Sequence, residues 1–101
     1  MKDKLIAYLG FAQKSKNLIF GVDNIEAKER KIVMAIIDSS LSDNSLNKLN
    51  NIANRNNFHI FMSDSSLDEL LGTHNCKAIG LTSRDLSLAI KKLNILKEVQ
   101  N

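Results

Sequence analysis

The sequence predicts an α/β protein: a three-layer α/β/α sandwich around a small four-stranded, mostly parallel (mixed) sheet. Short apolar runs alternate with segments of helical spacing along the whole chain. One run, residues 32–37, is continuously apolar and partly β-branched, as in a central strand covered on both faces. Such alternation is typical of a sheet with helices on both sides. No linker, low-complexity tract or repeat divides the chain, so we expect one domain, residues 1–101.

The N-terminal elements are predicted from spacing and from one glycine. Residues 2–16 form the first helix, because apolar side chains recur there on one stripe: Leu5, Ile6, Leu9 and Ala12. Leu18–Phe20 follows as a short strand, and Gly21 ends it because glycine readily adopts positive φ in a tight turn. We expect Asp23 or Asn24 to cap a short second helix.

Three more strands are predicted, at residues 32–37, 58–62 and 77–81. Between the first two of these, Ser42 or Asp43 begins a third helix, whose buried stripe is Leu46, Leu49, Ile52 and Ala53.

Two further helices complete the predicted fold. Asp64 and the two serines after it cap a short helix that ends at Gly72. Thr82 or Ser83 caps a C-terminal helix, whose apolar side is Leu86, Ala89, Ile90, Leu93 and Leu96.

Composition bears on the compartment and on cofactors. No apolar run approaches the roughly 20 residues that cross a bilayer, and the N-terminus does not read as a signal peptide. Cys76 is the one cysteine and forms no internal disulfide, which agrees with a reducing compartment. The scattered glycines make neither G-x-G-x-x-G nor G-K-[ST]. We therefore expect a cytoplasmic protein with no membrane partner and no cofactor.

Charge falls into three blocks along the chain. Residues 1–31 carry seven Lys/Arg against four Asp/Glu, residues 32–70 carry two against five, and residues 71–101 carry five against two. If the two basic ends meet in space, they form a cationic face of the kind that binds phosphate backbones. The alternative is ordinary solvated surface.

The segment most informative about function is LGFAQKSKNLIFG, residues 9–21. With the residues that follow, it places backbone amides, a helix start and several cations beside one glycine turn. Such an arrangement is suited to binding a phosphate group. Nucleic acid is therefore the first partner to consider. We expect Lys14 and Lys16 to flank the turn and neutralise RNA phosphates, or else to complement the carboxyl end of the first helix.

The residues after the strand offer a second set of candidate contacts. Gly21, Asp23 and Asn24 would present free backbone amides at a helix N-terminus, which is a recurrent anion site. An ordinary helix cap is the alternative for Asp23 and Asn24. Lys28 and its basic neighbours would line the same face, or form a solvated charge run.

Metal binding and catalysis are not predicted. The candidate ligands His59, His74 and Cys76 lack any paired metal-ligand spacing. His74 and Cys76 lie two residues apart on a loop, with no acid after them to orient the imidazole. We therefore expect no metal and no enzyme activity.

Several segments, taken in order, resemble a known family. In LGFAQKSKNLIFG, a leucine–glycine, an alanine, a basic pair and a small residue precede an apolar strand closed by glycine. The order continues through IVMAIIDSS, FHIFM, ELLG and KAIGLTSRDLSLAIKKL. Over nearly its whole length the chain thus resembles the YlxQ-like bacterial branch of the kink-turn-binding ribosomal protein superfamily, of the L-seven-Ae type.

The resemblance implies the same fold and a non-enzymatic, RNA-binding function, in which the protein is ribosome-associated or binds structured, kink-turn-like RNA. Members that bind kink-turns use the glycine turn, the start of the second helix and the loop before the last strand. These positions correspond here to Gly21, Asn24 and the loop Thr73, His74 and Asn75. The hydroxyl, imidazole and amide of that loop can bond to bases or riboses, or can be ordinary loop groups.

The glycine turn departs from the family pattern. That pattern is glycine, any residue, asparagine, glutamate, two further residues and lysine. Here Gly21 is followed by Asp23, Asn24 and Ala27 at the last three defined positions. A carboxylate cannot donate to a guanine edge, and alanine adds no cation. The alternative function is therefore a protein-interaction module of the same fold that has lost specific RNA reading, with protein partners.

Overall fold

The computed structural model describes residues 2–99. Along the chain the elements are α1 (Lys2–Lys14), β1 (Leu18–Phe20), α2 (Val22–Ala27), the 3-10 turn η1 (Glu29–Lys31), β2 (Met34–Ile37), α3 (Asp43–Asn56), β3 (His59–Met62), α4 (Leu67–Leu71), β4 (Ala78–Leu81), α5 (Arg84–Lys92) and β5 (Lys97–Glu98). Within the described residues, no helix has the length and apolar character needed to span a membrane.

The sheet has five strands in the order β1-β4-β2-β3-β5. Only β2 and β3 are parallel neighbours, and the other three pairs are antiparallel. The prediction of a mixed sheet with helices on both sides is confirmed. The predicted strand count of four and the mostly parallel character were wrong, since five strands form a mostly antiparallel sheet.

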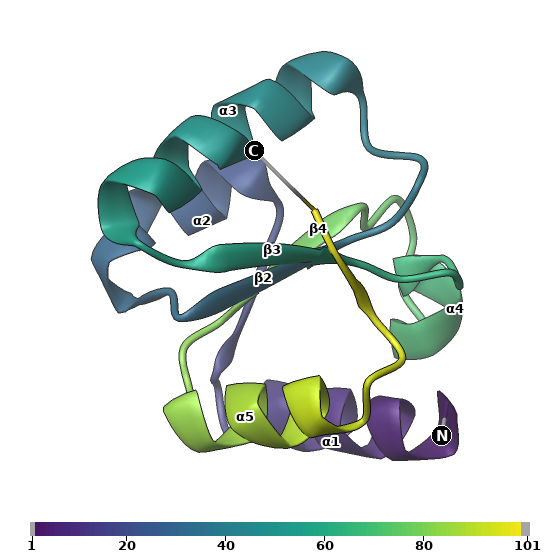
Figure 1. Cartoon of the computed structure of the whole chain (residues 1–101). Coiled ribbons are helices and arrows are strands. Elements are labelled where there is room, and N and C mark those ends of the chain that lie inside the picture. Colours follow the sequence, from purple (N-terminus) through teal and green to yellow (C-terminus); the bar gives the residue numbers. More distant parts are fainter. Residues whose placement is uncertain (1, 100–101) are drawn as a thin grey trace.

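The connection between β3 and β4 explains this correction. The long helix α3 returns the chain along the sheet, so β2 and β3 run in the same direction. Helix α4 has only five residues and lies at one end of the sheet (Figure 1). The chain therefore re-enters the sheet at the end where it left, and β4 runs antiparallel to β2.

The fifth strand replaces the predicted end of the last helix. Helix α5 ends at Lys92, and Asn94 has a left-handed φ of 56°. The chain then turns back, and Lys97–Glu98 pairs with β3, followed by a 2.8 Å hydrogen bond from Val99 N to Ile60 O. Leu96 thus lies beyond the helix that was predicted to contain it.

Helices cover both faces of the sheet, with α1 and α5 on one face and α2 and α3 on the other (Figure 1). Alternate residues of β2 point to opposite faces. Met34 and Ile36 join the cluster that includes Leu9 of α1, whereas Ala35 and Ile37 join the cluster formed with α2 and α3. Burial on both faces is why this strand is apolar throughout.

Serine side chains cap three helices, which confirms the predictions for α3 and α5, whereas of Asp64 and the two serines predicted to cap α4 it is Ser66 that does so. Ser42, Ser66 and Ser83 each accept a hydrogen bond from the backbone N–H three residues later, at the starts of α3, α4 and α5. The predicted cap of α2 was wrong. That helix begins at Val22, Gly21 occupies the N-cap position, and no side chain caps it.

Helix α4 is also tied to the end of β2. The buried carboxylate of Asp38 accepts hydrogen bonds from the backbone N–H of Leu67 at 2.8 Å and from that of Ser40 at 2.9 Å. These bonds fix the start of α4, and through α4 they fix the loop that follows it.

Candidate functional site

The turn at Gly21 depends on a backbone conformation that only glycine adopts easily. Its φ is 86° and its ψ is 150°. Its N–H donates to Ala78 O at 2.9 Å, and its carbonyl accepts from Ile25 N at 3.0 Å. Apart from the residues next to it in the chain, no atom lies within 4 Å of the position that a Cβ would occupy. The glycine is therefore required by conformation rather than by crowding, and the turn needs no capping side chain.

Asn24 and Asp23, the two predicted contacts after Gly21, already have partners within the protein. Asn24 Nδ2 donates to Phe20 O at 2.8 Å, which closes the turn. The Asp23 carboxylate pairs with Lys48 of α3 at 2.7 Å. The hydrogen bond and charge of Lys48 lower the pKa of Asp23. The negative charge that would repel phosphate here is therefore balanced by a neighbouring cation.

The pairing of Asp23 belongs to a charged layer between α2, η1 and α3. Lys48 also approaches Glu26, at 3.2 Å. Arg55 makes a bidentate pair with Glu29, with donor–acceptor distances of 2.8 and 2.7 Å. Hydrogen bonds from Arg55, and then one from Asn56, lower the pKa of Glu29 to about 2. The acids of α2 and η1 thus face α3.

Hydrogen bonds to the carboxylate of Asp68 hold the loop of Thr73, His74 and Asn75. Asp68 accepts hydrogen bonds from Cys76 N at 2.8 Å, Thr73 Oγ1 at 2.8 Å and Asn75 N at 3.0 Å. These bonds lower the pKa of Asp68, and the bond from Cys76 contributes most. Asn75 has a left-handed φ of 61°. The Thr73 hydroxyl is therefore used to order the loop, whereas the His74 and Asn75 side chains are exposed.

The fold brings the Gly21 turn and this loop together. Both contribute to a hollow of about 440 Å³, lined by Gln13, Phe20, Gly21, Thr73, His74, Asn75, Cys76 and Lys77. An adjoining hollow of about 190 Å³ is lined by Gly21, Val22, Asp23, Leu41, Ser45, Asn75, Lys77 and Ala78. We call the surface formed by Gly21, Thr73, His74, Asn75 and Lys77 the Gly21 surface.

Lys16, one of the lysines predicted beside Gly21, lies elsewhere. Asn17 O accepts a hydrogen bond from Thr82 N at 3.0 Å, at the far end of the β1–β4 pair from Gly21 and Ala78. Lys16 directly precedes Asn17, and Lys14 is the last residue of α1. An extended residue advances the chain by about 3.3 Å, so β1 carries the chain more than 10 Å from Lys16 to Gly21. Lys16 therefore does not flank the turn as expected, whereas Lys14 directly follows Gln13, which lines the hollow beside Gly21.

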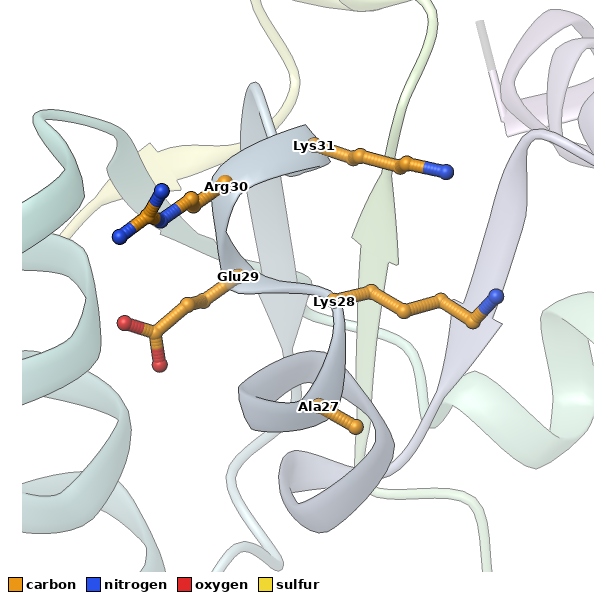
Figure 2. A pocket seen from close by; sticks show the side chains of 5 residues that line it. All are labelled: Ala27, Lys28, Glu29, Arg30 and Lys31. Atoms are coloured by element: carbon orange, nitrogen blue, oxygen red, sulfur yellow. The ribbon is translucent and has the colours of Figure 1, made fainter.

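Lys28 is also distant from the Gly21 surface. It follows α2 and lines an open hollow of about 500 Å³ with Ala27, Glu29, Arg30 and Lys31. Figure 2 shows Lys28 and Lys31 extending to one side of this turn, and Glu29 and Arg30 to the other.

Sequence reasoning missed two residues of this site. Lys77 is exposed and borders both hollows beside Gly21. A cation directly before the last predicted strand was an available signal for it. Asp68, which holds the loop, was missed as well. A carboxylate in a short helix before a polar loop is a weaker signal, because surface helices commonly carry acids.

The thiol of Cys76 is partly buried just before β4. Burial raises its pKa, so the reactive thiolate is disfavoured. Within residues 2–99, no three His, Cys, Asp or Glu side chains come together in an arrangement that could hold a metal ion.

The fold and these hollows define an α/β protein with a five-stranded mixed sheet and a polar surface at one end. No protein-family model matches the chain, and no curated protein matches it. A solved structure of a protein of unknown function from Bacillus halodurans is similar in fold, with a TM-score of 0.77 and 17% sequence identity. The match covers 87% of this chain and 93% of that one. At this identity the comparison establishes the fold alone.

Proposed function

We propose that this protein is a non-enzymatic RNA-binding protein of the YlxQ-like type, which recognises structured, kink-turn-like RNA through the Gly21 surface. One observation carries the proposal. The two segments to which the family resemblance assigns RNA contact are about 50 residues apart in sequence, yet both line one hollow.

The available groups suit base edges, riboses and phosphate. Asn75 supplies an amide and His74 an imidazole, and both side chains are exposed. Lys77 adds a cation between the two hollows and can neutralise a phosphate. The pairing of Asp23 with Lys48 reduces the repulsion that its carboxylate would exert on RNA. Asn75 and Lys77 are therefore the central contacts of the proposal.

The chemistry of Cys76 supports a binding function rather than catalysis. Its raised pKa and its place in the loop held by Asp68 favour a structural role. The free cysteine also fits a reducing compartment, and we propose that the protein acts in the cytoplasm.

The test is a titration of the nuclease-treated protein against a kink-turn RNA and an unkinked duplex of equal length, at two salt concentrations. We expect preferential binding to the kink-turn. Asn75→Ala and Lys77→Gln should each weaken kink-turn binding by about three- to tenfold, the value of a single hydrogen bond or charge contact. Lys92→Gln, on α5, is the control and should have little effect.

Equal binding to both RNAs that high salt abolishes would contradict this proposal. It would favour the alternative, a protein-interaction module. The departures at Asp23 and Ala27 and the internal hydrogen bond of Asn24 favour that alternative. A reproducible protein partner that survives nuclease treatment would support it.

A further inference from the structure

We propose that a second surface, at the opposite end of the sheet from the Gly21 surface, binds the phosphate backbone of RNA. This surface, which we call the basic end, consists of Lys16, Lys28, Lys31 and Arg84. The inference rests on the proposed function for the class of partner, but it uses different residues.

Hydrogen bonds between strand ends bring three distant segments to the basic end. Asn17 O accepts from Thr82 N at 3.0 Å, and Asn17 Oδ1 accepts from Thr82 Oγ1 at 3.0 Å. Val33 N donates to Leu81 O at 2.8 Å. Three of the cations lie within two residues of these contacts: Lys16, Lys31 and Arg84. Arg84 of the C-terminal basic block therefore lies at the same end of the sheet as Lys16 and Lys31 of the N-terminal block.

Lys28 and Lys31 extend to the same side of the η1 turn (Figure 2). Lys31 N donates to Lys28 O at 2.9 Å, so the turn holds the two backbones together. Glu29 extends to the other side, where Arg55 binds its carboxylate at 2.7 Å. The acid between the two lysines therefore does not neutralise them.

The cations of the basic end are exposed and unpaired. Within residues 2–99, none of the four takes part in an ion pair. Asp85 is the adjacent acid, and it lines a groove between α1 and α5 that also contains Lys4 and Lys92. Unpaired cations gathered at one end raise the local positive potential and attract a polyanion.

The two ends of the sheet differ in charge, so we expect them to have different roles in RNA binding. Six acids lie at the Gly21 end, of which Asp23 pairs with Lys48 and Glu69 with Lys2: Asp23, Asp38, Asp43, Asp64, Asp68 and Glu69. Phosphate contacts supply affinity, whereas base contacts supply specificity. The basic end is thus suited to hold backbone, and the Gly21 surface to read bases or riboses. Because the two surfaces lie at opposite ends of the β1–β4 pair, we expect each to hold its own RNA segment.

The test compares two triple variants with the same net charge, using an unbulged RNA duplex over a range of salt concentrations. The variant of the basic end is Lys16→Gln, Lys28→Gln and Lys31→Gln. The control is Lys4→Gln, Lys92→Gln and Lys97→Gln, whose side chains are exposed and lie outside the basic end. Circular dichroism checks that both fold.

We expect the basic-end variant to lose at least about tenfold in affinity at low salt, with the salt dependence of log K reduced by about two to three units. The control should lose much less. Equal losses would show that net charge alone governs binding, and would overturn the proposal. Unchanged binding by the basic-end variant, or binding to anionic lipid vesicles but not to the duplex, would also overturn it.

The experiments can disprove either proposal without disproving the other. If the basic-end variant binds the duplex normally while Asn75→Ala still lowers the preference for a kink-turn, only the basic-end assignment is wrong. If the wild type has no kink-turn preference but the basic-end variant loses duplex binding, the Gly21 assignment is wrong and the basic end stands.

Discussion

Asp68 Oδ1 accepts the backbone N–H of Cys76 at 2.8 Å, and this contact joins the short helix α4 to the start of the strand β4. The same carboxylate binds Thr73 and Asn75. One acidic side chain thus determines the shape of the loop that faces the Gly21 turn.

Replacing Asp68 with Asn should loosen this loop without unfolding the protein. Asn offers one acceptor oxygen where Asp68 uses two, so at least one of the three donors loses its partner. We expect hydrogen exchange at the Asn75 and Cys76 amides to accelerate by roughly tenfold. Asp64→Asn, an exposed site with the same charge change, is the control. Unchanged exchange in Asp68→Asn would show that the carboxylate does not hold the loop.

Gly21→Ala should destabilise the fold by about 1–3 kcal/mol, because φ 86° and ψ 150° form a region that essentially only glycine occupies. Urea denaturation measures the change. Gly10→Ala is the matched control, since Gly10 lies within α1 and a Cβ there meets no atom within 4 Å. That control should stabilise by about 0.5–1 kcal/mol. Equal effects of the two substitutions would contradict the conformational argument.

Lowering the pH should weaken the ion pair and hydrogen bonds between η1 and α3. The pKa of Glu29 falls from 4.5 to about 2 because Arg55 and Asn56 bind the charged form. Its contribution to stability is therefore complete above about pH 4.5 and is lost as the pH falls toward 2. We expect Glu29→Gln to make the free energy of unfolding less dependent on pH in this window. Asp64→Asn is the control, because it leaves the contact between Arg55 and Glu29 intact and should keep the pH dependence of the wild type. Chemical denaturation at several acidic pH values measures this, and identical profiles for Glu29→Gln and the wild type would refute it.

The Cys76 thiol should react slowly in the folded protein. Burial raises its pKa above the usual 9.0, so little thiolate forms near neutral pH. A chromogenic disulfide reagent should label Cys76 more slowly than free cysteine at pH 7 to 8, and unfolding in urea should remove the difference. Labelling as fast as free cysteine in the folded state would indicate an activated thiol instead.

Local patterns predicted the elements well because they depend on nearby residues. Ser42, Ser66 and Ser83 cap their helices through the backbone N–H three residues later, a contact contained within each segment. The strand over residues 34–37 is covered on both faces, so all of its residues are apolar. This continuous apolar run is what identifies the strand in the sequence. The short strand Lys97–Glu98 was missed because it is exposed and carries no hydrophobic alternation.

The candidate site was predicted in part. Gly21 and the 73–75 loop do lie together, whereas Lys16 and Lys28 lie apart from them. Lys16 and Gly21 are close in sequence, but the strand Leu18–Phe20 between them is extended. The two residues therefore lie at opposite ends of that strand.

The sequence by itself determined the α/β class, four of the five strands, the helices and the glycine turn, because spacing, capping and positive φ are local properties. Tertiary structure alone decided strand direction and charge placement. An apolar strand such as β4 has the same pattern in either direction, and only the short helix α4 and pairing with β2 make it antiparallel. Likewise, Lys16 and Arg84 meet only because Asn17 pairs with Thr82, 65 residues further along the chain.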